Sequence, residues 1–132
     1  MGNRAMVKIQ CGASPGVYLY THQGGAELEQ DVRCALARQA RWDDASYLAR
    51  IVFEAMIGNQ QGRETGLGIQ AISQDDLQHP LIVLDTQSQC AWLCPIKGSG
   101  EPDEAAGFGR MSMDRAALGD LAPMYHAGAR SS

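Results

Sequence analysis

Alternating apolar and polar positions dominate the first part of the chain. Every second side chain is apolar in residues 4–10, and the alternation returns in residues 17–22. This period is typical of strands that bury one face. The run Cys-Gly-Ala-Ser-Pro-Gly between them is rich in turn-forming residues. The pattern predicts a β-hairpin whose core-facing side chains are Ala5, Val7, Ile9, Val17 and Leu19.

The turn also predicts the register of this hairpin. If the turn joins Gln10 to Gly16, the even-numbered side chains lie together on the face that points away from the core. They form three cross-strand pairs: Lys8 with Tyr18, Met6 with Tyr20, and Arg4 with His22.

Two helical patterns follow the hairpin. Apolar residues recur at helical spacing from residue 26 to residue 41. A second pattern begins after Asp43-Asp44, where an aspartate suits the N-cap, and ends at Gly58-Asn59. In this second helix, Leu48, Ile51 and Val52 begin the apolar stripe.

The remaining pattern predicts three more strands and a tail. The strands are expected at 66–73, 81–86 and 89–94. From residue 98 the composition shifts to Gly, Pro, Glu and Ala, which is typical of a linker. Residues 112–118 could form one short helix, with Ser112 or Asp114 near its cap.

These elements predict an α+β fold in two layers. The order ββααβββ indicates an antiparallel sheet of about five strands with two helices packed on one face, because the helices need the sheet to bury their apolar stripes. We expect a single α+β domain over residues 1–97. Residues 98–132 are expected to be a linker-like tail that packs on the domain or is partly disordered.

The face of Tyr18 and Tyr20 has more aromatic and long side chains than a solvated face needs. Three explanations are open: the tail folds over it, a homodimer or protein partner buries it, or it is a platform that stacks a flat ligand. Trp92 could join the same face. In the first explanation the covering side chains are Phe108, Met111, Met113, Leu118 and Tyr125.

Composition and charge exclude several function classes. The chain has 132 residues, with 11 basic and 15 acidic side chains and a net charge of −4. That length favours one domain, and the acidic balance argues against binding to nucleic acid or to acidic membranes. No apolar run approaches the ~18 residues of a membrane-spanning helix. We therefore expect a cytoplasmic protein without nucleic-acid or membrane partners.

The cysteines and histidines do not predict a metal or cofactor. Cys11, Cys34, Cys90 and Cys94 are scattered, and the three histidines are isolated. A structural zinc site needs paired ligands at short spacing. We expect free thiols, no metal and no cofactor.

One corner of the hairpin could bind an anion. His22 ends the second predicted strand just before Gly24-Gly25 and the first helix. The backbone N–H groups of a helix N-terminus attract anions, and Arg4 could add charge there. The simpler alternative is that the glycines make a sharp turn and that His22 bonds a neighbour. No motif for nucleophilic, metal-assisted or phosphate-binding catalysis occurs elsewhere in the chain.

The segments Arg4–Ile9 and Val17–Gly25 resemble a group of small bacterial and phage-borne proteins. These share an Arg-Ala start, an alternating hairpin and, before a helix, a Tyr-x-His-x-Gly-Gly or similar His-Trp-Asp-Gly segment. Gln23 stands where an aromatic residue is frequent in the group. No activity is established for the group, so the resemblance implies only a bacterial or prophage setting and no catalytic residue.

Together these features predict a small non-enzymatic binding or interaction protein, such as an accessory factor of a prophage or mobile element. It would act through the Tyr18/Tyr20 face or as a homodimer. The alternative is a small enzyme or sensor that binds an anionic small molecule at Arg4, His22 and Gly24-Gly25.

Overall fold

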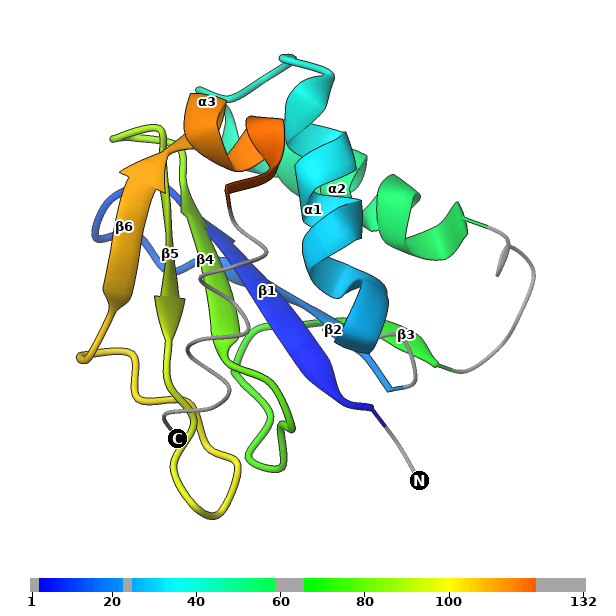
Figure 1. The fold of residues 1–132 in the computed structure, drawn as a ribbon, viewed down its shortest axis with the longest axis vertical. Coiled ribbons are helices and arrows are strands. Elements are labelled where there is room, and N and C mark those ends of the chain that lie inside the picture. The colour runs from blue at the N-terminus through cyan, green and yellow to red at the C-terminus, as the bar shows by residue number, and fades with distance from the viewer. Residues whose placement is uncertain (1–2, 23–24, 59–65, 121–132) are drawn as a thin grey trace.

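The computed structural model describes residues 3–22, 25–58 and 66–120 (Figure 1). Within them the chain forms an α+β domain with one mixed sheet and helices on one of its faces. The elements are β1 (Ala5–Gln10), β2 (Val17–Thr21), a 3₁₀ turn (Gly25–Glu27), α1 (Leu28–Ala37), α2 (Ala45–Ile57), β3 (Leu67–Gln70), β4 (Leu81–Asp85), β5 (Cys90–Cys94), β6 (Phe108–Ser112), α3 (Met113–Arg115) and a π-helical turn (Ala116–Asp120).

The sheet differs from the predicted antiparallel sheet of about five strands. Among the described residues it has six strands in the order β3-β2-β1-β4-β5-β6. β1 and β4 run parallel, and every other pair of neighbours is antiparallel. The antiparallel prediction was wrong because side-chain alternation determines which face a residue occupies, not which strand lies next to it. The long connection through both helices allows the parallel pair.

The hairpin register is confirmed within β1 and β2. Lys8 lies opposite Tyr18 and Met6 opposite Tyr20. The ladder ends before the expected pairing of Arg4 with His22. There the backbone N–H of Asn3 donates to the carbonyl oxygen of His22 at 2.7 Å, while the N–H of Arg4 donates to the Gln78 side chain.

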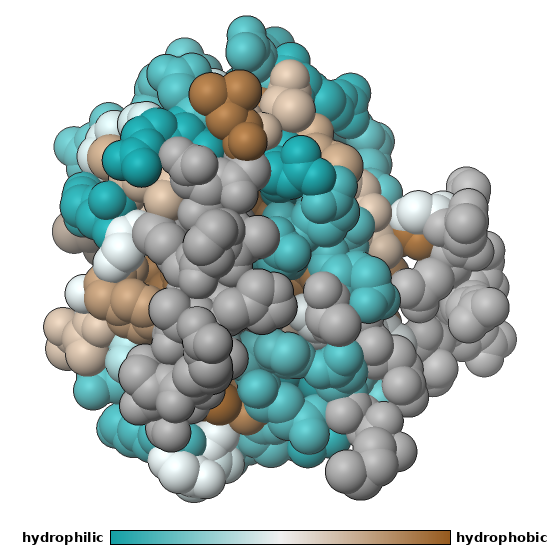
Figure 2. Space-filling model, in the orientation of Figure 1, coloured by the Kyte–Doolittle hydropathy of each residue, from teal (hydrophilic) through white to brown (hydrophobic). Residues whose placement is uncertain are grey.

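The main core lies between the sheet and the helices. α1, α2 and α3 all cover the same face of the sheet (Figure 1). That side of the molecule is mostly hydrophilic on its outside, as Figure 2 shows, so the helices direct their apolar stripes inward. The buried side chains come from both layers and include Ala5, Val7, Ile9, Leu19, Leu28, Leu36, Leu48, Ile51, Val52, Ile82 and Leu93. The prediction that the odd-numbered hairpin residues face the helices is confirmed.

Local capping explains where α2 and α3 begin. The side chain of Asp44 accepts hydrogen bonds from the backbone N–H groups of Ser46 and Tyr47 at 3.1 and 3.3 Å, as expected for an N-cap. Ser112 caps α3 by accepting from the N–H of Arg115. The sequence predicted a cap from the pair Asp43-Asp44 and a cap at Ser112 or Asp114, and the structure selects Asp44 and Ser112.

Part of the expected tail belongs to the sheet and to the helix layer. Residues 108–112 form β6, which pairs with β5, and α3 follows it onto the helix layer. Met111 and Met113 are buried in the core on the helix side and Phe108 packs against it, so the first of the three explanations, in which they cover the tyrosines, is wrong for these residues. Leu118 is 84% exposed, and Tyr125 lies outside the described residues.

Asp85 joins the end of β4 to the turn of the β1–β2 hairpin. The buried carboxylate accepts hydrogen bonds from the N–H of Gly12 at 2.7 Å, the hydroxyl of Ser88 at 2.7 Å and the N–H of Gln87 at 3.3 Å. Burial alone would raise the pKa of Asp85, but the hydrogen bonds outweigh it, so the pKa is lowered.

We expect Asp85→Asn to destabilise the protein by about 1–3 kcal/mol near neutral pH, because the negative charge and one of the two acceptor oxygens are lost. A lowered pKa means that the carboxylate stabilises the fold above its ordinary unfolded pKa of about 3.9, and that this stability is lost as the pH falls through the folded pKa. Urea unfolding at several pH values measures the difference. The exposed Asp75→Asn serves as control, and an equal effect of both substitutions would contradict the assignment.

Asp31 of α1 is expected to destabilise the fold at neutral pH. Burial, and then the charges of Glu27 and Glu29, raise its pKa to about 6. A raised carboxyl pKa costs stability as the pH rises from the unfolded value of about 3.9 through the folded value. Asp31→Asn should therefore raise the melting temperature at about pH 7.5 and leave it unchanged below about pH 4. A decrease at neutral pH would refute this.

Candidate functional site

A groove opens on the face of the sheet that the helices leave uncovered. Its volume is about 290 Å³. It lies between the hairpin turn, the middle strands and the loop before β6. The lining residues are Lys8, Gln10, Gly12, Ala13, Ser14, Val83, Trp92, Cys94 and Glu104. We call it the Lys8–Trp92 groove.

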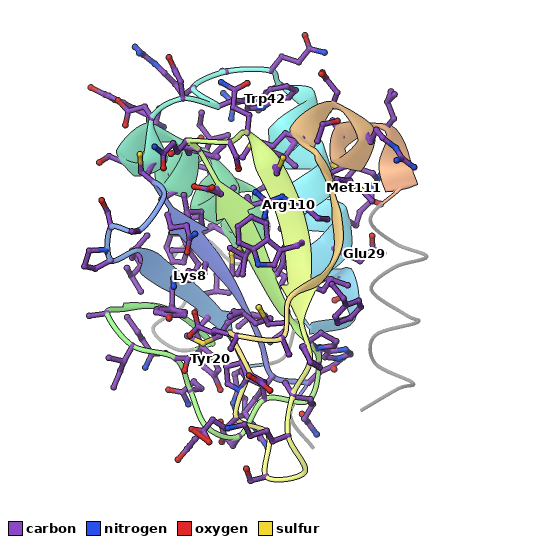
Figure 3. The ribbon with its side chains drawn as sticks, turned by 90° about the vertical axis from the view of Figure 1, so that its left-hand side faces the viewer. Lys8, Tyr20, Glu29, Trp42, Arg110 and Met111 are labelled. Atoms are coloured by element: carbon purple, nitrogen blue, oxygen red, sulfur yellow. The ribbon has the colours of Figure 1, made fainter. Side chains whose placement is uncertain are left out.

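Strand register builds the floor of this groove. Lys8 of β1 lies opposite Tyr18 on one side and Val83 of β4 on the other, and Val83 lies opposite Trp92 of β5. These four side chains therefore form one row across four strands on the uncovered face. Figure 3 shows Lys8 and Tyr20 on this face, while Met111 lies on the side of the helices.

Glu104, from the loop between β5 and β6, links two members of this row. One carboxylate oxygen of Glu104 accepts from Nζ of Lys8 at 2.8 Å, and the other accepts from the hydroxyl of Tyr18 at 2.6 Å. The Lys8 side chain is 16% exposed and that of Glu104 is 34% exposed. Nζ also lies 5.3 Å from the centre of the Tyr18 ring. The ion pair is thus half-buried and has good geometry.

This network keeps Lys8 and Tyr18 protonated. Burial lowers the pKa of Lys8, but the hydrogen bond and the charge of Glu104 outweigh it, and the pKa is raised. Burial also raises the pKa of Tyr18, and the hydrogen bond and charge of Glu104 raise it further. Near neutral pH the groove therefore presents the ammonium of Lys8, and the buried Tyr18 beside it stays a phenol.

Cys94 lies beside the same carboxylate. Its side chain is buried, and its thiol donates weakly to the carbonyl oxygen of Glu104 at 3.9 Å. Burial and the negative charge of Glu104 raise the pKa of Cys94 to about 11. Because a nucleophilic cysteine must be a thiolate, this cysteine is poorly suited to attack a substrate.

Trp92 forms a rigid wall of the groove. The Arg110 guanidinium carbon lies 4.5 Å from the ring centre of Trp92, in cation–π geometry. The backbone of Gly107 approaches the indole so closely that a Cβ there would lie 2.8 Å from its Cδ1 atom. The ring is thus held by its neighbours before any ligand arrives.

The two predicted tyrosines do not form an open platform. Tyr18 is 7% exposed, and its ring belongs to a second buried cluster with Met6, Leu77, Leu81 and Cys94. Tyr20 is half-buried, and its hydroxyl lies 3.1 Å from Nδ1 of His22. Loop residues from 71–80 and 95–107 cover much of this face. The aromatic side chain that lines the groove is Trp92.

The predicted anion corner is occupied by contacts within the protein. Nε of Arg4 donates to the carbonyl oxygen of Asp76 at 2.9 Å and lies 3.2 Å from its carboxylate. The N–H of Gly25 donates to the carbonyl oxygen of Asn3 at 2.8 Å. A Cβ at residue 25 would lie 2.3 Å from that same oxygen, which accounts for the glycine. Gly24 lies outside the described residues, and an anion site here stays a prediction.

The sequence pattern placed Lys8 on this face, with Trp92 as a candidate for it, but it did not single out Glu104. Lys8 and Glu104 are separated by 96 positions in the chain. Nothing in the Gly- and Ala-rich loop marks Glu104 as a partner of the hairpin. Its role follows only from the path of that loop across the uncovered face.

Residues 3–22, 25–58 and 66–120 contain neither a candidate metal site nor a membrane-spanning helix. Within them, no group of three or more His, Cys, Asp or Glu side chains could hold a metal ion. None of the helices in that part of the chain is long and apolar enough to cross a membrane.

Comparisons with protein-family models, with curated proteins and with solved structures found no match to this chain.

We expect opposite changes in the pKa of Tyr18 when its two charged neighbours are removed. Glu104→Gln removes an influence that raises this pKa and should lower it, whereas Lys8→Met removes one that lowers it and should raise it further. A pH titration of the Tyr18 ring by ¹³C NMR measures both shifts. Shifts of the same sign in the two variants would contradict the network.

Proposed function

We propose that this protein is a small non-enzymatic binding protein whose ligand occupies the Lys8–Trp92 groove. The observation that carries this proposal is the half-buried Lys8–Glu104 ion pair beside an aromatic wall that Arg110 and Gly107 hold in place. A pre-formed concave site with a few convergent polar groups is the usual form of a small-molecule site.

The protonation states in the groove favour binding over catalysis. Raised pKa values keep Lys8 as an ammonium, Tyr18 as a phenol and Cys94 as a thiol near neutral pH. An amine base or nucleophile and a thiolate nucleophile require a lowered pKa instead. Of these groups, the Lys8 ammonium has hydrogens left to donate to a ligand, because the one hydrogen of the Tyr18 hydroxyl is donated to Glu104 and the thiol of Cys94 is buried.

The groove favours a small planar ligand with an acidic group. The indole of Trp92 offers a surface for a flat ring, and stacking on an aromatic side chain contributes roughly 1–3 kcal/mol. A ligand carboxylate can share the ammonium of Lys8 with Glu104, because an ammonium has three donors. Gln10 and Ser14 add polar groups at the rim.

The biological context of this binding function, a prophage or mobile element, rests on the sequence resemblance alone. The similarity of the hairpin to small phage-borne proteins supports an accessory role for a prophage or mobile element. The groove supports the binding function independently of that setting.

A fluorescence titration tests the groove with defined probes. Trp42→Phe leaves Trp92 as the sole tryptophan, and Phe is a mild replacement because the buried Nε1 of Trp42 has no hydrogen-bond partner. Benzoate, nicotinate and indole-3-acetate are the probes, and acetate controls for charge without a ring. We expect a saturable change in Trp92 emission with at least one aromatic acid.

Matched lysine variants make this test specific. The chain has two lysines. Lys97 pairs with Glu101 at 3.8 Å on the exposed surface, so Lys97→Met is a control for Lys8→Met. Lys8→Met should weaken binding by about tenfold or more, since a charge-assisted hydrogen bond is lost. Absence of saturable binding to every aromatic acid, or equal loss in both variants, would overturn the proposal.

A further inference from the structure

The two edges of the sheet differ in how well they are protected against pairing with a further strand. In the part of the chain that the structure describes, β3 and β6 are the edge strands. β6 carries Arg110, has Gly109 at a positive φ and shifts register against β5, and such irregularities and charges discourage pairing with another strand. β3 reads Leu-Gly-Ile-Gln, without a charge or a proline.

The outer edge of β3 presents unpaired main-chain groups. The N–H of His22 donates to the carbonyl oxygen of Gly66 at 2.8 Å, and antiparallel hydrogen-bonded pairs alternate along a ladder. With the register of β2 and β3, Gly68 and Gln70 therefore bond to β2. The N–H and C=O groups of Leu67 and Ile69 point outward, where no described strand lies.

Apolar side chains follow the same edge. Ile69 is 61% exposed and Ile72 is 75% exposed, although most other large apolar side chains are buried. Ile69 also borders a cleft of about 320 Å³ between α2 and the sheet. The residues that line this cleft are Val17, Leu19, Ser46, Ala49, Arg50, Phe53 and Ile69.

Nothing within one copy of the domain requires a glycine at position 68. A Cβ at this position would meet nothing within 4 Å, and its φ is not positive. Glycine weakens a strand unless another backbone approaches closely. A second strand that pairs along this edge brings its backbone close to Gly68.

We propose that β3 pairs antiparallel with β3 of a second copy, so that two sheets join into one. The outward main-chain groups allow Leu67 of one copy to bond to Ile69 of the other, which brings the two Gly68 residues together at the twofold axis. The two apolar clefts then lie on either side of the joint and cover each other's Ile69.

The charges beside the cleft between α2 and the sheet favour a second copy of the chain as the partner that covers it. Arg50 lines the cleft and forms an ion pair with Glu54, one turn further along α2, and the two side chains are 59% and 49% exposed. A twofold axis places like surfaces against each other in reversed direction, so a patch with both charges is self-complementary. A uniformly charged rim would instead repel its copy.

Sedimentation equilibrium on the full chain tests the proposal. The wild type should have twice the chain mass, and Ile69→Lys should raise the dimer dissociation constant by about tenfold or more, because it buries an unpaired charge. Leu118→Lys, at another exposed apolar position, is the matched control and should remain dimeric. A monomeric wild type, or equal effects of the two lysine substitutions, overturns the proposal.

Amide hydrogen exchange gives a second readout that does not depend on any variant. On dilution the amides of Leu67 and Ile69 should lose protection, while those of Gly68 and Gln70 remain protected by β2. Protection of Leu67 and Ile69 that is independent of concentration, or absent at every concentration, refutes strand pairing at this edge.

Discussion

The parallel pairing of β1 with β4 is the contact on which the rest of the fold depends. All five residues of β4 are buried, because helices cover one face of this strand and loops cover the other. β1 joins β4 to the hairpin, and the N–H of Thr86 continues the ladder by donating to the carbonyl oxygen of Gln10. A central strand buried on both sides requires two separate apolar clusters, and the structure has them.

The groove follows from the way in which the second cluster is covered. Helices cover one face of the sheet continuously, whereas loop residues 71–80 and 95–107 cover the other face only in part. Near the hairpin turn this loop cover is incomplete, and Lys8, Ser14 and Trp92 line the opening. Glu104 neutralises the lysine that the strand alternation directs into this partly buried place, since an unpaired charge there would be costly.

The same architecture also explains why the two edges of the sheet differ. β6 ends the sheet beside α3, and its irregular pairing with β5 and its arginine protect that edge. β3 is short and follows the helices, and α2 leaves the side chain of Ile69 largely exposed. The ligand groove and the unprotected edge involve separate residues of the sheet, so occupation of one leaves the other accessible.

Much of the local structure could be read from the chain itself. Alternation identified the buried and the uncovered faces of the hairpin, and the turn set its register. The pair Asp43-Asp44 and the choice of Ser112 or Asp114 marked helix starts to within two residues. Each of these depends on residues close together in sequence. The run Leu81–Leu84 is apolar on both faces, which is the pattern of a strand covered on both sides. Strand order, the place of β6 and the contact of Glu104 with Lys8 and Tyr18 came only from the tertiary structure. They join segments far apart in the chain, and no local periodicity carries information about which distant segment will lie alongside.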